Sequence, residues 1–335
     1  MRFRYATGCG RFCAPWVAIS CLLALLGPGA GSTRATTVYY TTNTAGELRR
    51  TDGRTTTVLL SGMTTPRDFA FGPDGLIYVA EEAGSKITRF DPETKKRVGA
   101  AFATSRRHIG LEFGADGLLY TSAATSDYNT GLVERYDAAT GAAAGLATAP
   151  SSNRAQFTAP ISGAYFEGME IGPDGNVYCA GWRTTSVEAY QGPNGPTPGA
   201  LVAHLRGGLN KPVNMTFGPD GALYVAEYVN STIMRYDAGA ATFRTFASGS
   251  FLGNPIGMDF GPDGSLYVAN NGSGRNNIIR IDGPAGTKPG SFLGVFATTT
   301  SQPAHILVVP EPSGAALLLV GATVLLAHRS RCHAR

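Results

Sequence analysis

The sequence predicts an all-β fold, a six-bladed β-propeller of four-stranded antiparallel blades, from a motif that recurs five times and from incomplete repeats at both ends. The copies of the motif are Phe71 to Ala80, Phe113 to Ser122, Ile171 to Ala180, Phe217 to Ala226 and Phe260 to Ala269. Their central residues are Asp74, Asp116, Asp174, Asp220 and Asp263, which follow one another at intervals of about 42 to 58 residues. A repeat near this length is typical of propeller blades.

Each copy of the motif predicts the first two strands of a blade. Its first residues are apolar, Gly-Pro-Asp-Gly follows as the turn, and a segment such as Leu-Tyr-Val forms the second strand. In such a turn proline fixes φ, the aspartate bonds the nearby backbone, and glycine accepts a positive φ. We therefore expect the repeated aspartates to shape turns and not to bind calcium, since no two of them share a short ligand loop.

The residues after each hairpin predict the third and fourth strands. The third strand ends in Arg89-Phe90-Asp91, Arg135-Tyr136-Asp137, Ala189-Tyr190-Gln191, Arg235-Tyr236-Asp237 and Arg280-Ile281-Asp282. Apolar stretches that predict the fourth strand include Val98 to Ala103, Ala200 to Leu205 and Phe292 to Ala297.

The two ends of the repeated region are expected to share the sixth blade. Residues 38–41, 47–52 and 56–60 resemble the second, third and fourth strands of a blade, but no first strand precedes them. Residues 302–310 align with residues 65–73 and supply the missing first strand. Sharing a blade between the termini removes the free edge of the ring.

Residues 1–35 are predicted to be a secretory signal peptide, because three arginines precede an apolar run from Ala14 to Leu26 and small residues follow it. The propeller is then expected to span residues 36–309, outside the cytoplasm.

Residues 310–335 carry an apolar segment between a proline motif and a basic tail. Pro310, Glu311 and Pro312 are followed by apolar or small residues from Gly314 to Ala327 and then by arginines. This order closely resembles the PEP-CTERM sorting signal. The resemblance implies a short membrane helix that anchors the chain transiently in the inner membrane, and an exosortase that cleaves near the motif. The protein is then secreted or delivered to the cell envelope or outer surface. The alternative is a permanent anchor at the C-terminus.

Composition limits the partners and the redox chemistry. The formal net charge is +4, but residues 36–309 alone carry −2, because the two terminal segments hold the excess arginine. We therefore expect no nucleic-acid partner, and we expect a monomer. Cys179 is the one cysteine within residues 36–309, so the exported propeller is expected to lack a disulfide, and Cys179 is expected to be a buried apolar residue.

The central channel is the place to search for chemistry, because first strands from several blades bring side chains to one axis. In the aligned repeats the channel positions hold Asp68, Glu167 and Asn214, which could be oxygen ligands for Ca²⁺ or another divalent cation. His108 or His305 would then act as the general base. The alternative, which we favour, is a channel whose isolated polar residues bind ordered water, with no cofactor.

The repeats resemble NHL repeats and the blades of streptogramin lyase and gluconolactonase-like propellers over residues 37–309. A gluconolactonase-like site would hold a divalent ion through Glu, Asn and Asp from different blades, and Glu167 and Asn214 are similar to part of that set. The chain has no Glu-x-His pair, which streptogramin lyases place at the channel. We expect a non-catalytic module that binds an extracellular polysaccharide or protein, with long loops such as Thr125 to Thr130 and Ala147 to Ala164 forming the surface. The alternative is a metal-dependent lactonase or related hydrolase.

Overall fold

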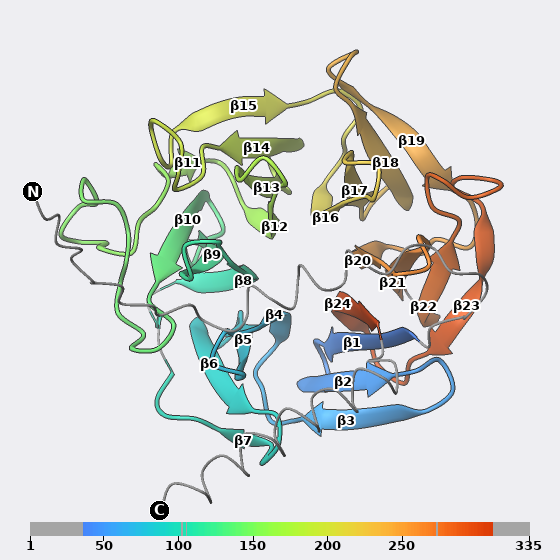
Figure 1. The fold of residues 1–335 in the computed structure, drawn as a ribbon, viewed down its shortest axis with the longest axis horizontal. Helices are drawn as coiled ribbons and strands as arrows, with labels where there is room; N and C mark the ends of the chain where they lie inside the picture. Colours follow the sequence, from blue (N-terminus) through green and yellow to red (C-terminus); the bar gives the residue numbers. More distant parts are fainter. Residues whose placement is uncertain (1–35, 102, 105, 273, 311–335) are drawn as a thin grey trace, which may run out of the picture. The chain divides into compact units, whose positions relative to one another are not determined.

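The computed structural model describes residues 36–101, 103–104, 106–272 and 274–310. Within these residues there are β-strands but no α-helix, and the strands form six antiparallel sheets of four. The sheets are arranged as blades around a common centre (Figure 1). The predicted fold class is therefore confirmed.

The blades follow one another along the chain, and each is written from its inner to its outer strand. Blade 1 contains β24 (Pro303–Pro310), β1 (Thr36–Thr42), β2 (Glu47–Thr51) and β3 (Thr56–Leu60). Blade 2 contains β4 (Pro66–Phe71), β5 (Ile77–Glu81), β6 (Lys86–Asp91) and β7 (Lys96–Arg97). Blade 3 contains β8 (Arg107–Phe113), β9 (Leu119–Ala124), β10 (Thr130–Tyr136) and β11 (Ile161–Ser162).

The remaining blades keep the same order. Blade 4 contains β12 (Phe166–Ile171), β13 (Val177–Gly181), β14 (Ser186–Tyr190) and β15 (Leu201–Leu205). Blade 5 contains β16 (Pro212–Phe217), β17 (Leu223–Glu227), β18 (Thr232–Asp237) and β19 (Thr242–Ser248). Blade 6 contains β20 (Pro255–Phe260), β21 (Leu266–Gly272), β22 (Arg275–Ile281) and β23 (Phe292–Thr298).

Blade 1 joins the two ends of the propeller, as the sequence predicted. Strand β24 pairs antiparallel with β1 over most of its length, with Val308 opposite Val38 and Ile306 opposite Tyr40. All four of these side chains are buried in one apolar cluster with the neighbouring blade 6. Pairing and packing at this point close the ring.

The motif aspartates perform the predicted turn function and also bind a tyrosine of the second strand. In the first copy, one Asp74 oxygen accepts the N–H of Leu76 and the other accepts the hydroxyl of Tyr78 at 2.8 Å. The other four copies repeat the tyrosine bond through Tyr120, Tyr178, Tyr224 and Tyr267. The ring of Tyr78 packs edge-on against Phe113 of the next blade. The repeated motif thus builds both the hairpin and the contact between blades.

The outer strands depart from the prediction in two blades. In blade 2 the fourth strand was expected at Val98 to Ala103, but it ends at Arg97, because Gly99 adopts a left-handed φ of 66° and turns the chain away. In blade 3 the outer strand has two residues, and a long loop instead covers the edge of β10 through bridges at Gln156 and Ala143.

The predicted signal peptide and most of the predicted sorting signal, from Glu311 onward, lie outside the described residues. No helix within the described part of the chain is long and apolar enough to cross a membrane.

Candidate binding face and central channel

The inner strands β4, β8, β12, β16, β20 and β24 surround the centre of the propeller (Figure 1). Each belongs to its own sheet and is not paired with the inner strand of the next blade. Backbone N–H groups on the inner edges therefore need acceptors other than a neighbouring strand.

Polar side chains of one inner strand supply these acceptors to the next. Asp68 accepts the N–H of Leu111 at 2.8 Å, and Asn214 accepts the N–H of Met258 at 3.2 Å. The same kind of bond joins Glu112 to Ile171, Glu170 to Phe217, and Asp259 to Val308. Two of the predicted metal ligands, Asp68 and Asn214, thus connect adjacent blades.

His305 completes this circle between blades 1 and 2. Its Nε2 atom lies 3.0 Å from Asp68 Oδ1, and its ring packs edge-on against Phe69. Burial lowers the pKa of His305, but the charge and hydrogen bond of Asp68 together with the charge of Asp259 outweigh burial, and the net result is a raised pKa. His305 is therefore an ion-pair partner at the junction of the two blades.

A small cavity at the axis brings four of the predicted site residues together. Its lining includes Asp68, Glu167, Asn214 and His305, with Arg67 among the other residues. Its volume is about 20 Å³, which is room for about one water molecule. An organic substrate does not fit into this space.

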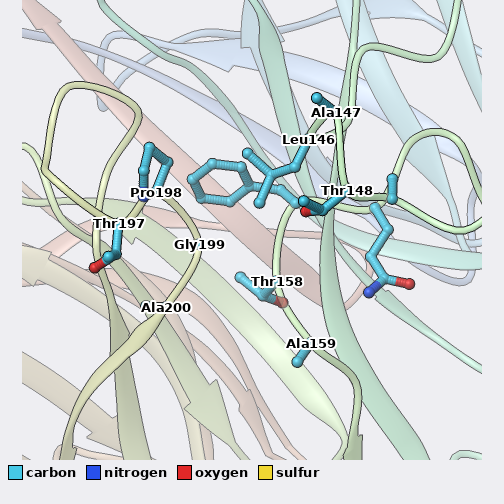
Figure 2. A pocket seen from close by; sticks show the side chains of 12 residues that line it. Leu146, Ala147, Thr148, Thr158, Ala159, Thr197, Pro198, Gly199 and Ala200 are labelled. Carbon is cyan, nitrogen blue, oxygen red and sulfur yellow. The ribbon is translucent and has the colours of Figure 1, made fainter.

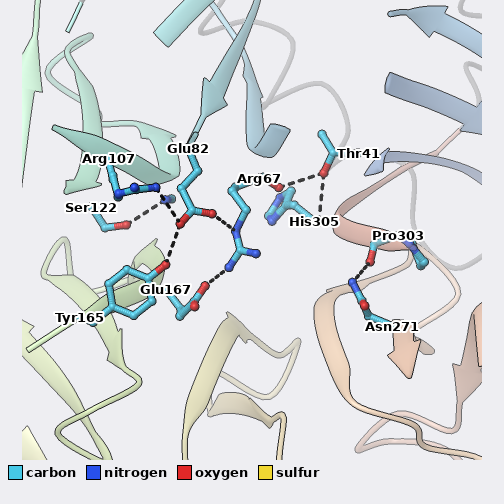
Figure 3. Close-up of polar contacts among 11 residues, drawn as sticks. Thr41, Arg67, Glu82, Arg107, Ser122, Tyr165, Glu167, Asn271, Pro303 and His305 are labelled. Carbon is cyan, nitrogen blue, oxygen red and sulfur yellow. Dashed lines mark hydrogen bonds and ion pairs between the residues drawn. The ribbon is translucent and has the colours of Figure 1, made fainter. Parts of the chain in front are cut away.

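Arg67 supplies the positive charge at this end of the cavity. Figure 3 shows its guanidinium between the carboxylates of Glu82 and Glu167. It forms an ion pair with Glu167, and its Nε lies 3.5 Å from Glu82 Oε2. Burial lowers the pKa of Arg67, but attraction to Glu167 and Glu82 outweighs burial and raises it, so the guanidinium stays charged.

The donor set predicted for a divalent cation does not fit that function in this arrangement. Both oxygens of Asp68 accept bonds from protein groups, the oxygen of Asn214 accepts a backbone N–H, and Glu167 is paired with Arg67. Within the described ranges, no group of three or more His, Cys, Asp and Glu side chains is placed to hold a metal ion.

His108 lies apart from the other predicted site residues. It is fully buried in blade 3, with Nδ1 3.4 Å from Thr121 Oγ1 and 3.9 Å from Glu134 Oε2. Burial lowers its pKa and favours the neutral ring. The structure does not bring His108 to the axis with His305.

Four aromatic residues, which we call the aromatic arc, lie at the mouth of the channel: Tyr128, Tyr165, Trp182 and Tyr228. Tyr165 precedes an inner strand, Trp182 and Tyr228 follow second strands, and Tyr128 lies in the turn after one. The start of a strand and the end of its antiparallel neighbour lie at the same edge of a sheet, so all four lie on one face of the propeller.

The members of the arc contact one another in sequence around the mouth. The rings of Tyr128 and Tyr165 meet edge-on at 4.9 Å between centroids, and those of Trp182 and Tyr228 at 5.6 Å. Trp182 also packs against the buried cluster that contains Tyr165, which joins the two pairs. The arc therefore extends over blades 3, 4 and 5.

Charged groups accompany the arc. The Arg107 guanidinium lies 4.4 Å above the ring of Tyr128, and Lys211 Nζ lies 4.7 Å above the ring of Trp182. The hydroxyl of Tyr165 donates to Glu82 at 3.2 Å (Figure 3). Aromatic surface bordered by fixed polar groups is suited to binding a ligand that is partly apolar and partly polar.

The sequence analysis missed Glu82, Trp182 and Tyr228, although a repeat signal marks them. Each lies eleven residues after the last residue of its inner strand. Their backbone N–H groups make the same bond, to the carbonyl of the residue preceding that strand: Thr65, Tyr165 and Lys211, respectively. This position faces the mouth, and its residue type differs between blades. A repeat alignment that compared this position across blades would have shown that it carries large aromatic or charged side chains in three of them.

A second cavity lies between the long loop of blade 3 and the loop that precedes β15 in blade 4 (Figure 2). It has a volume of about 510 Å³ and is lined by residues 146–149, 156–159 and 197–200, which are largely apolar. The loop from Ala147 to Ala164, which was expected to form a binding surface, contributes part of this lining.

Comparison with known proteins supports the fold and assigns no family. No protein-family model matches the chain, and no curated protein matches its sequence. Many solved structures are similar, and three of them illustrate the shared fold. A Bacteroides caccae protein of unknown function has 11% identity and a TM-score of 0.60, and the match covers 83% of this chain and all of that one.

The other two are named after enzymes. A streptogramin B lyase has 16% identity and a TM-score of 0.53 over 82% of this chain and 84% of that one. A suggested 6-phosphogluconolactonase from Bacteroides uniformis has 17% identity and a TM-score of 0.54 over 78% and 83%. Identity at this level shows a shared propeller fold alone.

Proposed function

We propose that this protein is an exported, non-catalytic module that binds a polysaccharide through the aromatic arc. The observation that carries the proposal is the placement of the partly exposed rings of Tyr128, Trp182 and Tyr228 at the channel mouth beside fixed charges, with the buried ring of Tyr165 supporting Tyr128. The C–H face of a sugar ring is apolar and packs on an aromatic ring, while its hydroxyl groups bind polar neighbours. The arc supplies both kinds of surface.

The small cavity below the arc favours binding of a ligand at the surface over a reaction at the axis. The cavity there admits about one water molecule, and Arg67 occupies the carboxylate that a metal would need. Among the residues that the structure describes, no contact at the axis favours the alternative of a metal-dependent lactonase, which would use Asp68, Glu167 and Asn214 with His108 or His305.

The proposal includes export and sorting, which rest on the sequence. Residues 1–35 would direct the chain out of the cytoplasm, and residues 310–335 would anchor it in the inner membrane until an exosortase cleaves near Pro310 to Pro312. The arc would then face extracellular polysaccharide, with the protein acting as a monomer and without a resident cofactor.

The test is affinity for a panel of soluble polysaccharides, measured with the purified full chain and with Trp182→Ala and Tyr228→Ala variants. Each substitution should weaken binding at least tenfold, about 1.4 kcal/mol, because it removes a contact ring. Phe292→Ala is the matched control, since this exposed aromatic residue lies on an outer strand of blade 6. Equal affinity of all four proteins, or no binding to any polysaccharide, would contradict the proposal.

A further inference from the structure

We infer that the aromatic arc selects acidic polysaccharides, and that Lys211 and Arg107 recognise the negative groups of the polymer. This inference rests on the proposed function and specifies its ligand class. Three observations support it: Lys211 and Arg107 lie on rings of the arc, Arg67 is already neutralised by carboxylates, and Tyr128 and Lys211 both have left-handed backbone conformations.

The cations at the mouth differ in whether carboxylates of the protein already neutralise them. Arg67 is held by two carboxylates, those of Glu82 and Glu167, and is not available to a ligand. Lys211 forms no ion pair with any carboxylate in the described ranges, and the aromatic face of Trp182 is its charge partner. An ammonium group on an aromatic ring retains the capacity to attract an anion.

Arg107 is the second available cation, at the opposite end of the arc. Its nearest carboxylate oxygen, on Glu82, lies 3.9 Å away, which is beyond hydrogen-bond distance. That oxygen already accepts the hydroxyl of Tyr165. About 25% of the Arg107 side chain is exposed, so its guanidinium can be reached by a ligand at the mouth.

The backbone at Lys211 shows what the side chain adds. Thr65, Lys211 and Asn254 each precede the proline that begins an inner strand, and their φ angles are 51°, 56° and 50°. The loop geometry therefore imposes a left-handed conformation whatever the side chain, and Asn adopts it most easily. A lysine gives no backbone advantage at this position, so its contribution is the charge that it places over Trp182.

Tyr128 gives an independent sign that this part of the mouth is specialised. It has a φ of 57° in the turn between the second and third strands of blade 3. The other blades place small residues in left-handed conformation in this turn: Gly46, Ser85, Thr185, Ser231 and Gly274. A bulky aromatic residue is energetically unfavourable in this conformation. In this conformation the ring of Tyr128 contacts Arg107 and Tyr165.

Together these observations place Arg107 over Tyr128, at one end of the arc, and Lys211 over Trp182, toward the other end. A polymer lying along the row would stack its sugar rings on the arc and present repeated acidic groups to Arg107 and Lys211. Attraction of this kind between partly exposed charges weakens as salt concentration rises.

The experiment compares two probes with one backbone, a polyuronate and the same polymer after reduction of its carboxyl groups to alcohols. The full chain should bind the polyuronate at least tenfold more tightly at low salt, and this ratio should fall as salt is added. Lys211→Gln should lose most of the preference while keeping its affinity for the reduced polymer, whereas Lys211→Arg should retain it. Lys288→Gln, which changes an exposed lysine in a turn of blade 6, is the matched control.

The outcomes separate the inference from the proposed function. Equal binding of both polymers by the full chain, or an unchanged preference in Lys211→Gln, would overturn the acidic selectivity. If Trp182→Ala still abolished binding in that case, the proposed function would stand. Failure of the full chain to bind either polymer would overturn both.

Discussion

The Nε2 atom of His305 lies 3.0 Å from the Oδ1 atom of Asp68, and this contact joins β24, the last described strand, to blade 2. The other Asp68 oxygen accepts the N–H of Leu111 in blade 3. One carboxylate therefore connects three blades at the axis. These contacts give Asp68 a structural function in joining the blades of the ring.

Replacing Asp68 with Ala should destabilise the propeller. The substitution leaves the buried N–H of Leu111 and the ring of His305 without their partner, and each such loss costs about 1–3 kcal/mol. Asp68→Asn, which keeps one oxygen, should lose less. The measurement is the free energy of unfolding in urea. Glu93→Ala, on an exposed turn, is the control and should stay within about 0.5 kcal/mol of the parent. Equal stability of Asp68→Ala and the control would refute the connecting function.

Stability should fall as pH rises, in part because of Glu112. Burial is the main reason that the pKa of Glu112 is raised to about 8. Repulsion from Asp68 also raises it, and the bond from the Ile171 N–H lowers it in part. In the unfolded chain a glutamate titrates near about 4.3. The folded state therefore binds the proton of Glu112 more tightly than the unfolded state does. The resulting contribution to the free energy of unfolding is complete below about pH 4 and is lost as pH rises toward 8.

Glu112→Gln isolates this contribution. Glutamine keeps an oxygen for the N–H of Ile171 but cannot ionise. We expect the variant to lose less stability than the parent between pH 5 and 8.5 and to be the more stable protein at the upper end. Urea unfolding at both pH values measures this, with Glu93→Gln as the control. A variant with the same pH dependence as the parent would argue against a protonated Glu112.

Closure through blade 1 predicts different results for two truncations. A chain that ends at Thr300 lacks β24, so β1 loses its inner partner and the apolar cluster of Val38, Tyr40, Ile306 and Val308 is broken. We expect this chain to lose its cooperative thermal unfolding transition. A chain that ends at Pro310 keeps all described strands and should melt like the full chain. A cooperative transition of unchanged midpoint in the shorter chain would contradict closure at this blade.

The sorting signal yields a prediction that is independent of the propeller. Replacing Pro310, Glu311 and Pro312 with Ala should leave an uncleaved precursor in the inner membrane, because the exosortase would no longer recognise the motif. Membrane fractionation followed by mass measurement detects the precursor. Substitution of Ser313 by Ala, just outside the motif, should leave processing intact. Normal cleavage of the triple variant would show that the motif does not direct processing.

The repeated motif allowed most of the fold to be predicted, because Asp74, Tyr78 and their counterparts form the same turn and the same hydrogen bond in every copy. Outer strands were less predictable, since they lie at the edge and tolerate breaks such as the one at Gly99. The function of the polar residues at the axis was the hardest part to predict from the sequence. Sequence alignment placed Asp68 and Asn214 there, but it did not reveal that their oxygens bind the backbone of the next blade.

Trp182 allows the most direct test of the binding face. The chain has two tryptophans, and the other, Trp16, lies in the predicted signal peptide. In a full chain with Trp16→Phe, fluorescence therefore reports on the aromatic arc alone. We predict that a polyuronate shifts the emission of Trp182 in a saturable manner, with a midpoint equal to the dissociation constant measured by an independent method. Polysaccharide binding that leaves this emission unchanged would contradict a site at the arc.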